Sequence, residues 1–108
     1  MVPDLGRICD AIRGMAYNIS VHGFLEMESD GITVSLLEHA IGADSPEIVE
    51  EYTLDNRGPS CLILGWLPSG EGIHVCMGYG GDKPNVVTVY RPDNRWNPDL
   101  RTRRATNE

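Results

Sequence analysis

The residue best placed for acid–base chemistry in this sequence is His74, which interrupts a run of apolar residues between Ile73 and Tyr79. An imidazole titrates near neutral pH, so it can donate or accept a proton in catalysis. The same position also suits a structural histidine that hydrogen-bonds to a neighbour. Thr88 and Tyr90 belong to a later run, and they share a face with His74 if the two runs pair as neighbouring strands. Tyr90 could then exchange a proton, stack on a nucleic-acid base, or serve only in packing.

Three further side chains could assist such chemistry. Arg57 and Arg91 flank the same region, and a guanidinium can hold a phosphate group with two parallel hydrogen bonds, although loop arginines commonly lie in solvent. His22 precedes Glu26 by one helical turn, which suits a metal pair, an acid–base pair, or a cap or hydrogen bond between elements. The candidate catalytic residues are therefore His74, His22, Tyr90, Arg57 and Arg91.

No metal or cofactor is predicted. Cys61, Cys76, His74 and His22 include zinc-ligating types, but they lack the ligand spacing of a structural zinc finger. Single cysteines of this kind usually pack as small apolar residues.

The candidate residues depend on a group of predicted strands. Residues 60–66, 73–79 and 85–90 are β-type runs, and Pro68–Gly70 and Gly80–Asp82 separate them as hairpin turns would. Residues 47–52 are predicted as an earlier strand whose charges favour an edge or half-exposed position. In the run 73–79, alternation places Ile73, Val75, Met77 and Tyr79 on one face and His74, Cys76 and Gly78 on the other. In the run 85–90, it places Val87 and Val89 on one face and Thr88 and Tyr90 on the other.

Helices are predicted before these strands. The first begins near Pro3–Asp4, with an apolar stripe that includes Leu5, Ile8, Cys9, Ile12 and Met15. Ser20 caps a second helix over residues 21–29, after an extended link at 16–20. Thr33 caps a third over residues 34–41, with Val34, Leu37 and Ile41 as its stripe.

This order of elements predicts an α+β fold in which two to three N-terminal helices pack on one face of a three- to four-stranded antiparallel sheet. Residues 1–96 form a single domain, and Trp96 fixes the start of a basic, flexible tail at residues 97–108. The uncovered face of the sheet would then display His74 and Tyr90 as neighbours.

The charge distribution bears on the partner. Residues 1–90 contain 13 acidic and 4 basic side chains, a net charge of −9, whereas residues 91–108 contain 5 basic and 3 acidic, a net charge of +2. An acidic body disfavours nucleic acid as a partner and favours a basic protein, or the chain's own basic tail. No apolar run approaches the roughly 18 residues of a membrane span. Three scattered cysteines and the absence of a basic–apolar leader favour the cytoplasm.

Several stretches, in this order, resemble the prokaryotic domain-of-unknown-function family 4258 over about residues 17–96. They are Ser20–Met27, Gly31–Val34, Ile48–Tyr52, Arg57–Leu62, His74–Val75 and Val87–Asp93. That family is similar to the RelE/MqsR-type toxin superfamily, in which helices precede a twisted antiparallel sheet. Some members resemble partners of YgiT-type zinc-finger antitoxins.

The resemblance implies two functions that the sequence leaves open. One is a non-catalytic interaction module of a toxin–antitoxin-type system. The other is a metal-independent messenger-RNA endonuclease that promotes attack of a ribose 2′-hydroxyl on the adjacent phosphate. In the second, His22 and His74 would transfer protons, Tyr90 would be an orienting or acidic group, and Arg57 or Arg91 would hold the phosphate. The acidic body departs from the basic surface that such nucleases use.

Overall fold

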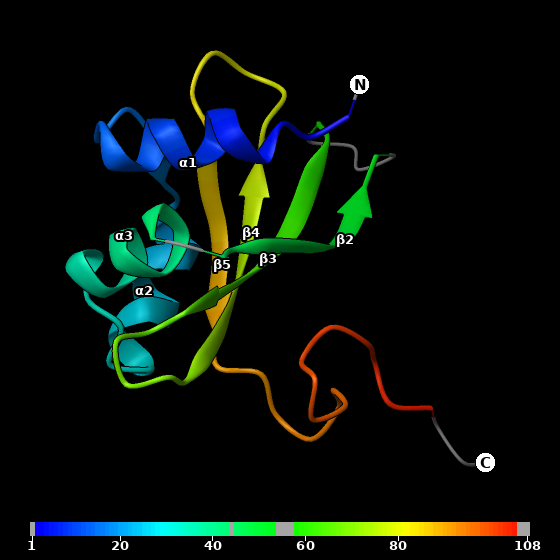
Figure 1. The fold of residues 1–108 in the computed structure, drawn as a ribbon. Coiled ribbons are helices and arrows are strands. Elements are labelled where there is room, and N and C mark those ends of the chain that lie inside the picture. The colour runs from blue at the N-terminus through cyan, green and yellow to red at the C-terminus, as the bar shows by residue number, and fades with distance from the viewer. Residues whose placement is uncertain (1, 44, 54–57, 106–108) are drawn as a thin grey trace.

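A computed structural model describes residues 2–43, 45–53 and 58–105. Its elements follow the order α1 (Leu5–Arg13), β1 (Asn18–Ile19), α2 (Val21–Ser29), α3 (Val34–Gly42), β2 (Glu47–Tyr52), β3 (Ser60–Trp66), β4 (Gly72–Gly78) and β5 (Asn85–Tyr90) (Figure 1). The predicted α+β class is confirmed. None of the described helices is long and apolar enough to cross a bilayer.

The sheet differs from the prediction in having five strands and mixed direction. Its order is β1-β5-β4-β3-β2, and β1 runs parallel to β5 while the other neighbours are antiparallel. The strand that sequence patterns missed, β1, has only two residues, Asn18 and Ile19, paired with Asn85 and Val86. A pair of residues is too short to show alternation, which is why it was predicted only as an extended link. As predicted, β2 lies at an edge.

Each helix begins where a side chain caps it. Asp4, Ser20 and Thr33 are the N-cap residues, and their side chains accept hydrogen bonds from the backbone N–H groups three residues later. These contacts satisfy donors that have no partner inside the helix. The predicted starts of the second and third helices are confirmed.

Two predicted stripe residues lie outside the core. Helix α1 ends at Arg13, and Met15 follows in a left-handed conformation with 74% of its surface exposed. Val34 is the first residue of α3 and is also exposed. Both lie at a helix end, where the chain direction changes and helical spacing no longer determines the buried side.

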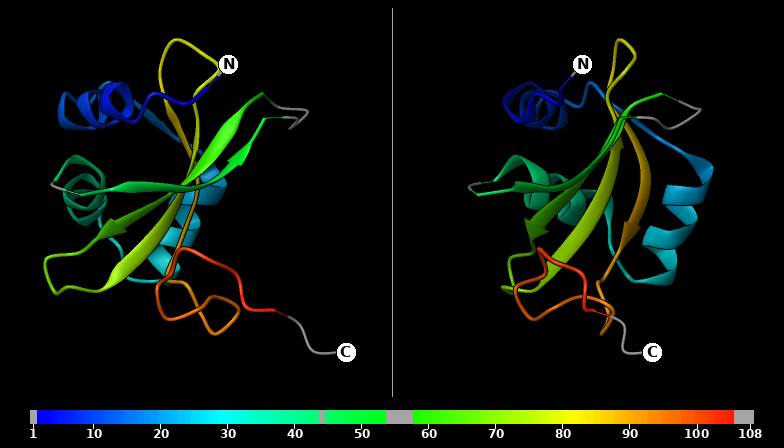
Figure 2. Two further views of the ribbon diagram at one scale, coloured as in Figure 1. Left: turned by 45° about the vertical axis from the view of Figure 1, so that its right-hand side comes forward. Right: turned by 90° about the vertical axis from the view of Figure 1, so that its right-hand side faces the viewer.

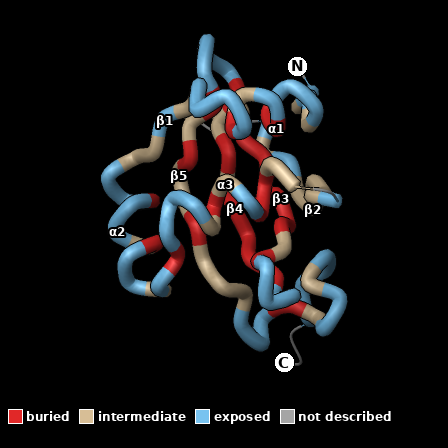
Figure 3. Tube along the Cα trace, turned by 60° about the vertical axis from the view of Figure 1, so that its left-hand side comes forward, coloured by how far each residue is buried: buried red, intermediate tan, exposed pale blue. Residues whose placement is uncertain are grey.

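The core lies between the helices and one face of the sheet. Ile63, Val75 and Met77 contribute from the strands, and Ile12 and Ile41 from the helices; all five are almost completely buried. Figure 3 shows this as buried segments along β3, β4 and β5. Burying this apolar surface supplies most of the favourable free energy of folding.

A β-bulge changes the facing of residues in β5. Cys76 pairs with Thr88 and Met77 pairs with Val86, so Val87 is an extra residue without its own partner in β4. Val86 and Val89 are therefore the buried valines, whereas Val87 is half-buried. The prediction that Val87 and Val89 share a face is wrong, because alternation assumes an uninterrupted ladder.

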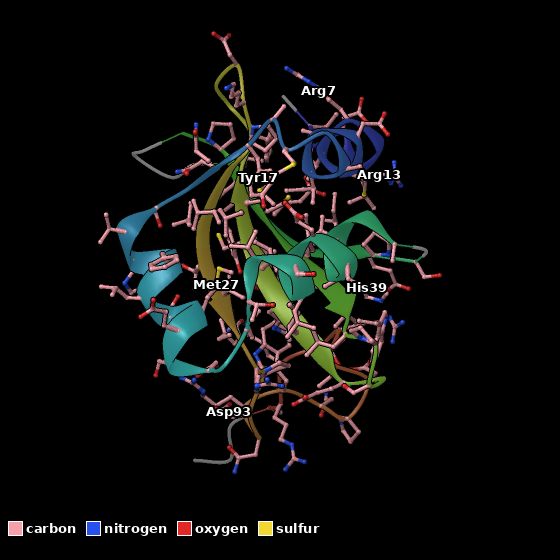
Figure 4. The ribbon with its side chains drawn as sticks, turned by 90° about the vertical axis from the view of Figure 1, so that its left-hand side faces the viewer. Arg7, Arg13, Tyr17, Met27, His39 and Asp93 are labelled. Carbon is pink, nitrogen blue, oxygen red and sulfur yellow. The ribbon has the colours of Figure 1, made fainter. Side chains whose placement is uncertain are left out.

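Helix α2 lies along the outer edge of β5 (Figure 3). Its Glu26 carboxylate accepts a hydrogen bond from the backbone N–H of Val89 (3.2 Å), and Asp30 accepts one from that of Arg91 (3.1 Å). Figure 4 shows Met27 of the same helix between α2 and the sheet. Acidic side chains thus satisfy strand groups that β1 is too short to reach, which protects this edge.

The C-terminal segment, residues 91–105, lies at the end of β5 on the side of the sheet opposite α1 and α3 (Figure 2). Trp96 is buried and forms an isolated antiparallel bridge with Arg103. Trp96 therefore anchors the segment, as its position in the sequence suggested. The bridge joins Trp96, at the predicted end of the domain, to Arg103 in the predicted tail.

Candidate functional site

His74 lies under the C-terminal segment and is completely buried. Its Nδ1 is 3.0 Å from the Tyr90 hydroxyl, and its Nε2 is 2.8 Å from the carbonyl oxygen of Leu100. A carbonyl only accepts, so Nε2 carries a hydrogen and donates it to Leu100. In the neutral ring Nδ1 then accepts from Tyr90. The predicted pairing of His74 with Tyr90 on one face is confirmed, but the C-terminal segment covers that face at His74.

Aromatic rings complete the enclosure of His74. The Trp96 ring packs against the imidazole edge to face at 4.3 Å between centroids, and the Tyr90 ring does so at 5.2 Å. The guanidinium of Arg103 lies over the Trp96 ring, with its central carbon 4.6 Å from the ring centroid. These contacts give the imidazole an apolar, aromatic environment.

That environment determines the protonation of the pair. Burial lowers the pKa of His74 below its ordinary value of 6.5, outweighing the opposite effects of the Leu100 hydrogen bond and the Glu50 charge. Burial also raises the pKa of Tyr90. The folded protein therefore holds a neutral imidazole beside a neutral phenol at pH 7.

Two arginine–carboxylate pairs hold the C-terminal segment on strand β2. Arg101 donates from Nε and Nη2 to Glu47, at 2.5 and 3.0 Å. Arg103 donates in the same way to Glu50, at 2.8 and 3.0 Å. The hydrogen bonds from Arg103 lower the pKa of the Glu50 carboxyl. Both pairs have the two-pronged geometry that makes arginine selective for carboxylates.

Sequence reasoning did not single out these four residues as a site. Glu47 pairs with Leu64 and Glu50 with Leu62 in β3. Leu64 in turn pairs with His74 in β4, so both carboxylates face the same side of the sheet as His74. The contrast between an acidic body and a basic tail was the available signal, and the structure shows that the tail does contact the body.

Arg91 is occupied by other partners. Its Nε donates to the carbonyl oxygen of Asp30 (3.1 Å), and Nη1 forms an ion pair with Glu71. The Arg91 guanidinium is therefore bound to Asp30 and Glu71, and neither contact involves His74. Arg57 lies outside the described residues.

His22 belongs to a different part of the surface. It is 3.4 Å from Glu26 through Nε2, and its side chain is largely exposed. With Thr88, Ser60 and Lys83 it lines an open hollow of about 930 Å³ that does not include His74 or Tyr90. The candidate residues that the structure describes thus divide among three places: the covered His74–Tyr90 pair, the hollow, and the Arg91 contacts.

The buried imidazole predicts how stability depends on pH. The unfolded chain binds a proton at His74 near pH 6.5 while the folded chain resists it, so the free energy of unfolding should fall as pH drops below 6.5. Glu50 acts in the same direction at lower pH, because its folded pKa lies below its ordinary 4.5. Urea unfolding between about pH 7.5 and pH 5.5 would measure the effect of His74.

The matched variant for this experiment is His74→Gln, which keeps a donor and an acceptor but does not titrate. Its free energy of unfolding should change less over the same pH interval. A wild-type profile parallel to that of His74→Gln would contradict the pH prediction.

Among the residues that the structure describes, no three His, Cys, Asp or Glu side chains are grouped so that they could bind a metal ion. What the arrangement provides is a neutral, enclosed hydrogen-bonded pair and an acidic strand that binds arginines.

Comparison with known proteins found one family. The model described as Domain of unknown function (DUF4258) matches residues 19–91, which span α2, α3 and the strands from β2 to β5. No curated protein and no solved structure matches the chain significantly.

Proposed function

The chain belongs to the DUF4258 family, and we propose that it is a RelE-like interaction module of a toxin–antitoxin-type system that binds a basic segment of a partner protein. The observation that carries this proposal is the docking of Arg101 and Arg103 on Glu47 and Glu50. The chain's own segment demonstrates the chemistry of the surface, which is two carboxylates on an edge strand that receive two arginines. A zinc-finger-type antitoxin in the cytoplasm is the partner that the family resemblance favours.

The energetics of the docking support exchange with a partner. All four side chains of the two ion pairs are partly exposed. Solvent-exposed ion pairs contribute about 0–1 kcal/mol each, because water screens the charges and the side chains lose freedom. A partner segment that adds apolar contacts could therefore displace the C-terminal segment without overcoming a large electrostatic barrier.

A peptide with the sequence of residues 91–105 tests the surface. We expect the labelled peptide to bind weakly to the wild-type chain, because the same segment already occupies the surface at a high effective concentration. In the variant Arg101→Ala/Arg103→Ala the attached segment is weakened, and peptide affinity should rise at least tenfold by fluorescence anisotropy. Adding Glu47→Gln/Glu50→Gln should remove that gain.

The matched control is Glu51→Gln, which removes an exposed carboxylate of the same strand. Arg101 and Arg103 pair with Glu47 and Glu50 instead of with this carboxylate. It should leave peptide binding unchanged. Equal binding by the Glu47→Gln/Glu50→Gln and Glu51→Gln variants would show a general attraction to negative charge and would contradict the proposed surface.

The alternative function, a metal-independent messenger-RNA endonuclease, draws on one observation, the 3.0 Å contact between His74 and Tyr90. The enclosure of His74 and the charge of the body favour the interaction module. We expect messenger RNA incubated with the purified chain to stay intact, with or without chelator. Cleavage that persists in chelator and is lost in a folded His74→Gln variant would replace the interaction proposal with the nuclease.

A further inference from the structure

The outer face of α2 carries an exposed apolar row. Val21, Phe24 and Leu25 are 78%, 44% and 58% exposed. Their spacing of three and four residues puts them on one side of the helix. Phe24 is the chain's only phenylalanine. Aromatic and large aliphatic side chains gathered on an exposed surface typically mark a binding site.

The orientation of α2 is fixed by its contacts with β5, so the row cannot turn inward. Gly23 approaches the strand so closely that a Cβ there would lie 3.0 Å from the carbonyl oxygen of Val86. The Ser20 hydroxyl donates to Val87 O at 3.0 Å, and Glu26 accepts from Val89. With Gly23 and Met27 buried against the sheet, α2 leaves Val21, Phe24 and Leu25 on its outer side.

We propose that the outer face of α2 binds an amphipathic helix of a partner protein whose polar flanks are basic. Charge complementarity identifies the occupant. Glu28 is exposed on the same side of the helix, α2 contains no lysine or arginine, and residues 1–90 carry a net charge of −9. A second copy of the chain would bring the same acidic flanks against these and be repelled.

The size of the row agrees with a short helix as the occupant. Stable interfaces between folded proteins bury about 800 Å² on each side, which three side chains cannot supply. An amphipathic helix needs only a few anchors at i, i+3 and i+4 positions. This inference rests on the proposed interaction function and adds a second binding surface to it. The two surfaces are separate, since α2 borders β5, near the edge of the sheet opposite β2.

A synthetic leucine–lysine peptide with leucines at i, i+3, i+4 and i+7 is the probe. We expect the wild-type chain to bind it more tightly than a shuffled peptide of the same composition, which has no apolar face. The variant Val21→Thr/Leu25→Gln should bind at least tenfold more weakly, measured by fluorescence anisotropy. Glu28→Lys should weaken binding of this peptide and strengthen binding of its leucine–glutamate counterpart.

Met15→Gln is the matched control, because Met15 is equally exposed but lies outside α2. It should leave peptide affinity unchanged. Equal binding of the ordered and shuffled peptides, or unchanged affinity in Val21→Thr/Leu25→Gln, would overturn the α2 site. So would self-association of the wild-type chain, by sedimentation velocity, that the double variant abolishes, since a second copy would then be the occupant.

The result also separates this site from the β2 surface. Glu47→Gln/Glu50→Gln should bind the leucine–lysine peptide as the wild type does. Failure of the leucine–lysine peptide alone refutes the α2 site and leaves the interaction function standing. Failure of this peptide and of the residue 91–105 peptide together refutes the interaction function.

Discussion

Replacing His74 with alanine is expected to lower the free energy of unfolding by about 3–4 kcal/mol. The ring is completely buried, so its removal leaves a cavity among Tyr90, Trp96 and the C-terminal segment. The Leu100 carbonyl and the Tyr90 hydroxyl would each lose a hydrogen-bond partner. Urea unfolding followed by tryptophan fluorescence would measure the loss, because Trp96 packs directly on the imidazole.

A second variant isolates the Tyr90 hydrogen bond, and a third serves as a control. Tyr90→Phe removes one hydroxyl and should cost about 1–2 kcal/mol, since the imidazole keeps its contact with Leu100. As a control, His39→Ala removes an exposed histidine from α3 and should change stability by less than about 0.5 kcal/mol. If His74→Ala were as mild as His39→Ala, the enclosed hydrogen-bonded arrangement would be wrong.

A methyl group added at position 65 should destabilise the fold by about 3 kcal/mol. Gly65 of β3 faces α3, and a Cβ there would lie 2.6 Å from the carbonyl oxygen of Ala40 and 3.0 Å from its carbonyl carbon. Those are backbone atoms, which cannot rotate away as a flexible side chain would. The variant Gly65→Ala must therefore move α3 away from the sheet, and thermal unfolding followed by circular dichroism would record the lower midpoint.

Gly81→Ala is the control for Gly65→Ala, because a Cβ at position 81 has no atom within 4 Å. Its stability should equal or slightly exceed that of the wild type, as the added methyl restricts the unfolded chain. A Gly65→Ala variant that melts together with Gly81→Ala would show that α3 does not pack on β3 at the distance described.

The variants His74→Ala and Gly65→Ala each test what covers one face of the sheet. Gly65 tests the face under the helices, and His74 tests the face under the C-terminal segment. The second bears directly on function, because exposed ion pairs hold the segment on β2, and its further anchors include Trp96 and the Leu100 carbonyl at His74. Displacement of residues 91–105 would expose His74 and Tyr90 together with the two carboxylates of β2.

Local sequence determined much of the scaffold. Ser20 and Thr33 predicted two helix starts because a side-chain oxygen before an apolar-periodic stretch satisfies free N–H groups within the same few residues. Strands β2, β3 and β5 have the predicted bounds, and β4 differs by one residue at each end. The shared face of His74 and Tyr90 was predicted on the condition that their runs are neighbouring strands, and the β4–β5 ladder confirms it.

Only the tertiary structure decided whether that pair faces solvent. The carbonyl that binds His74 is 26 residues away, and Arg101 and Arg103 reach carboxylates more than 50 residues earlier. No period of 2 or 3.6 residues encodes such contacts, because they depend on where the chain returns after β5. The bulge at Val87 and the pairing of β1 were hidden for the same reason: each is defined by a partner strand, and local alternation carries no record of it.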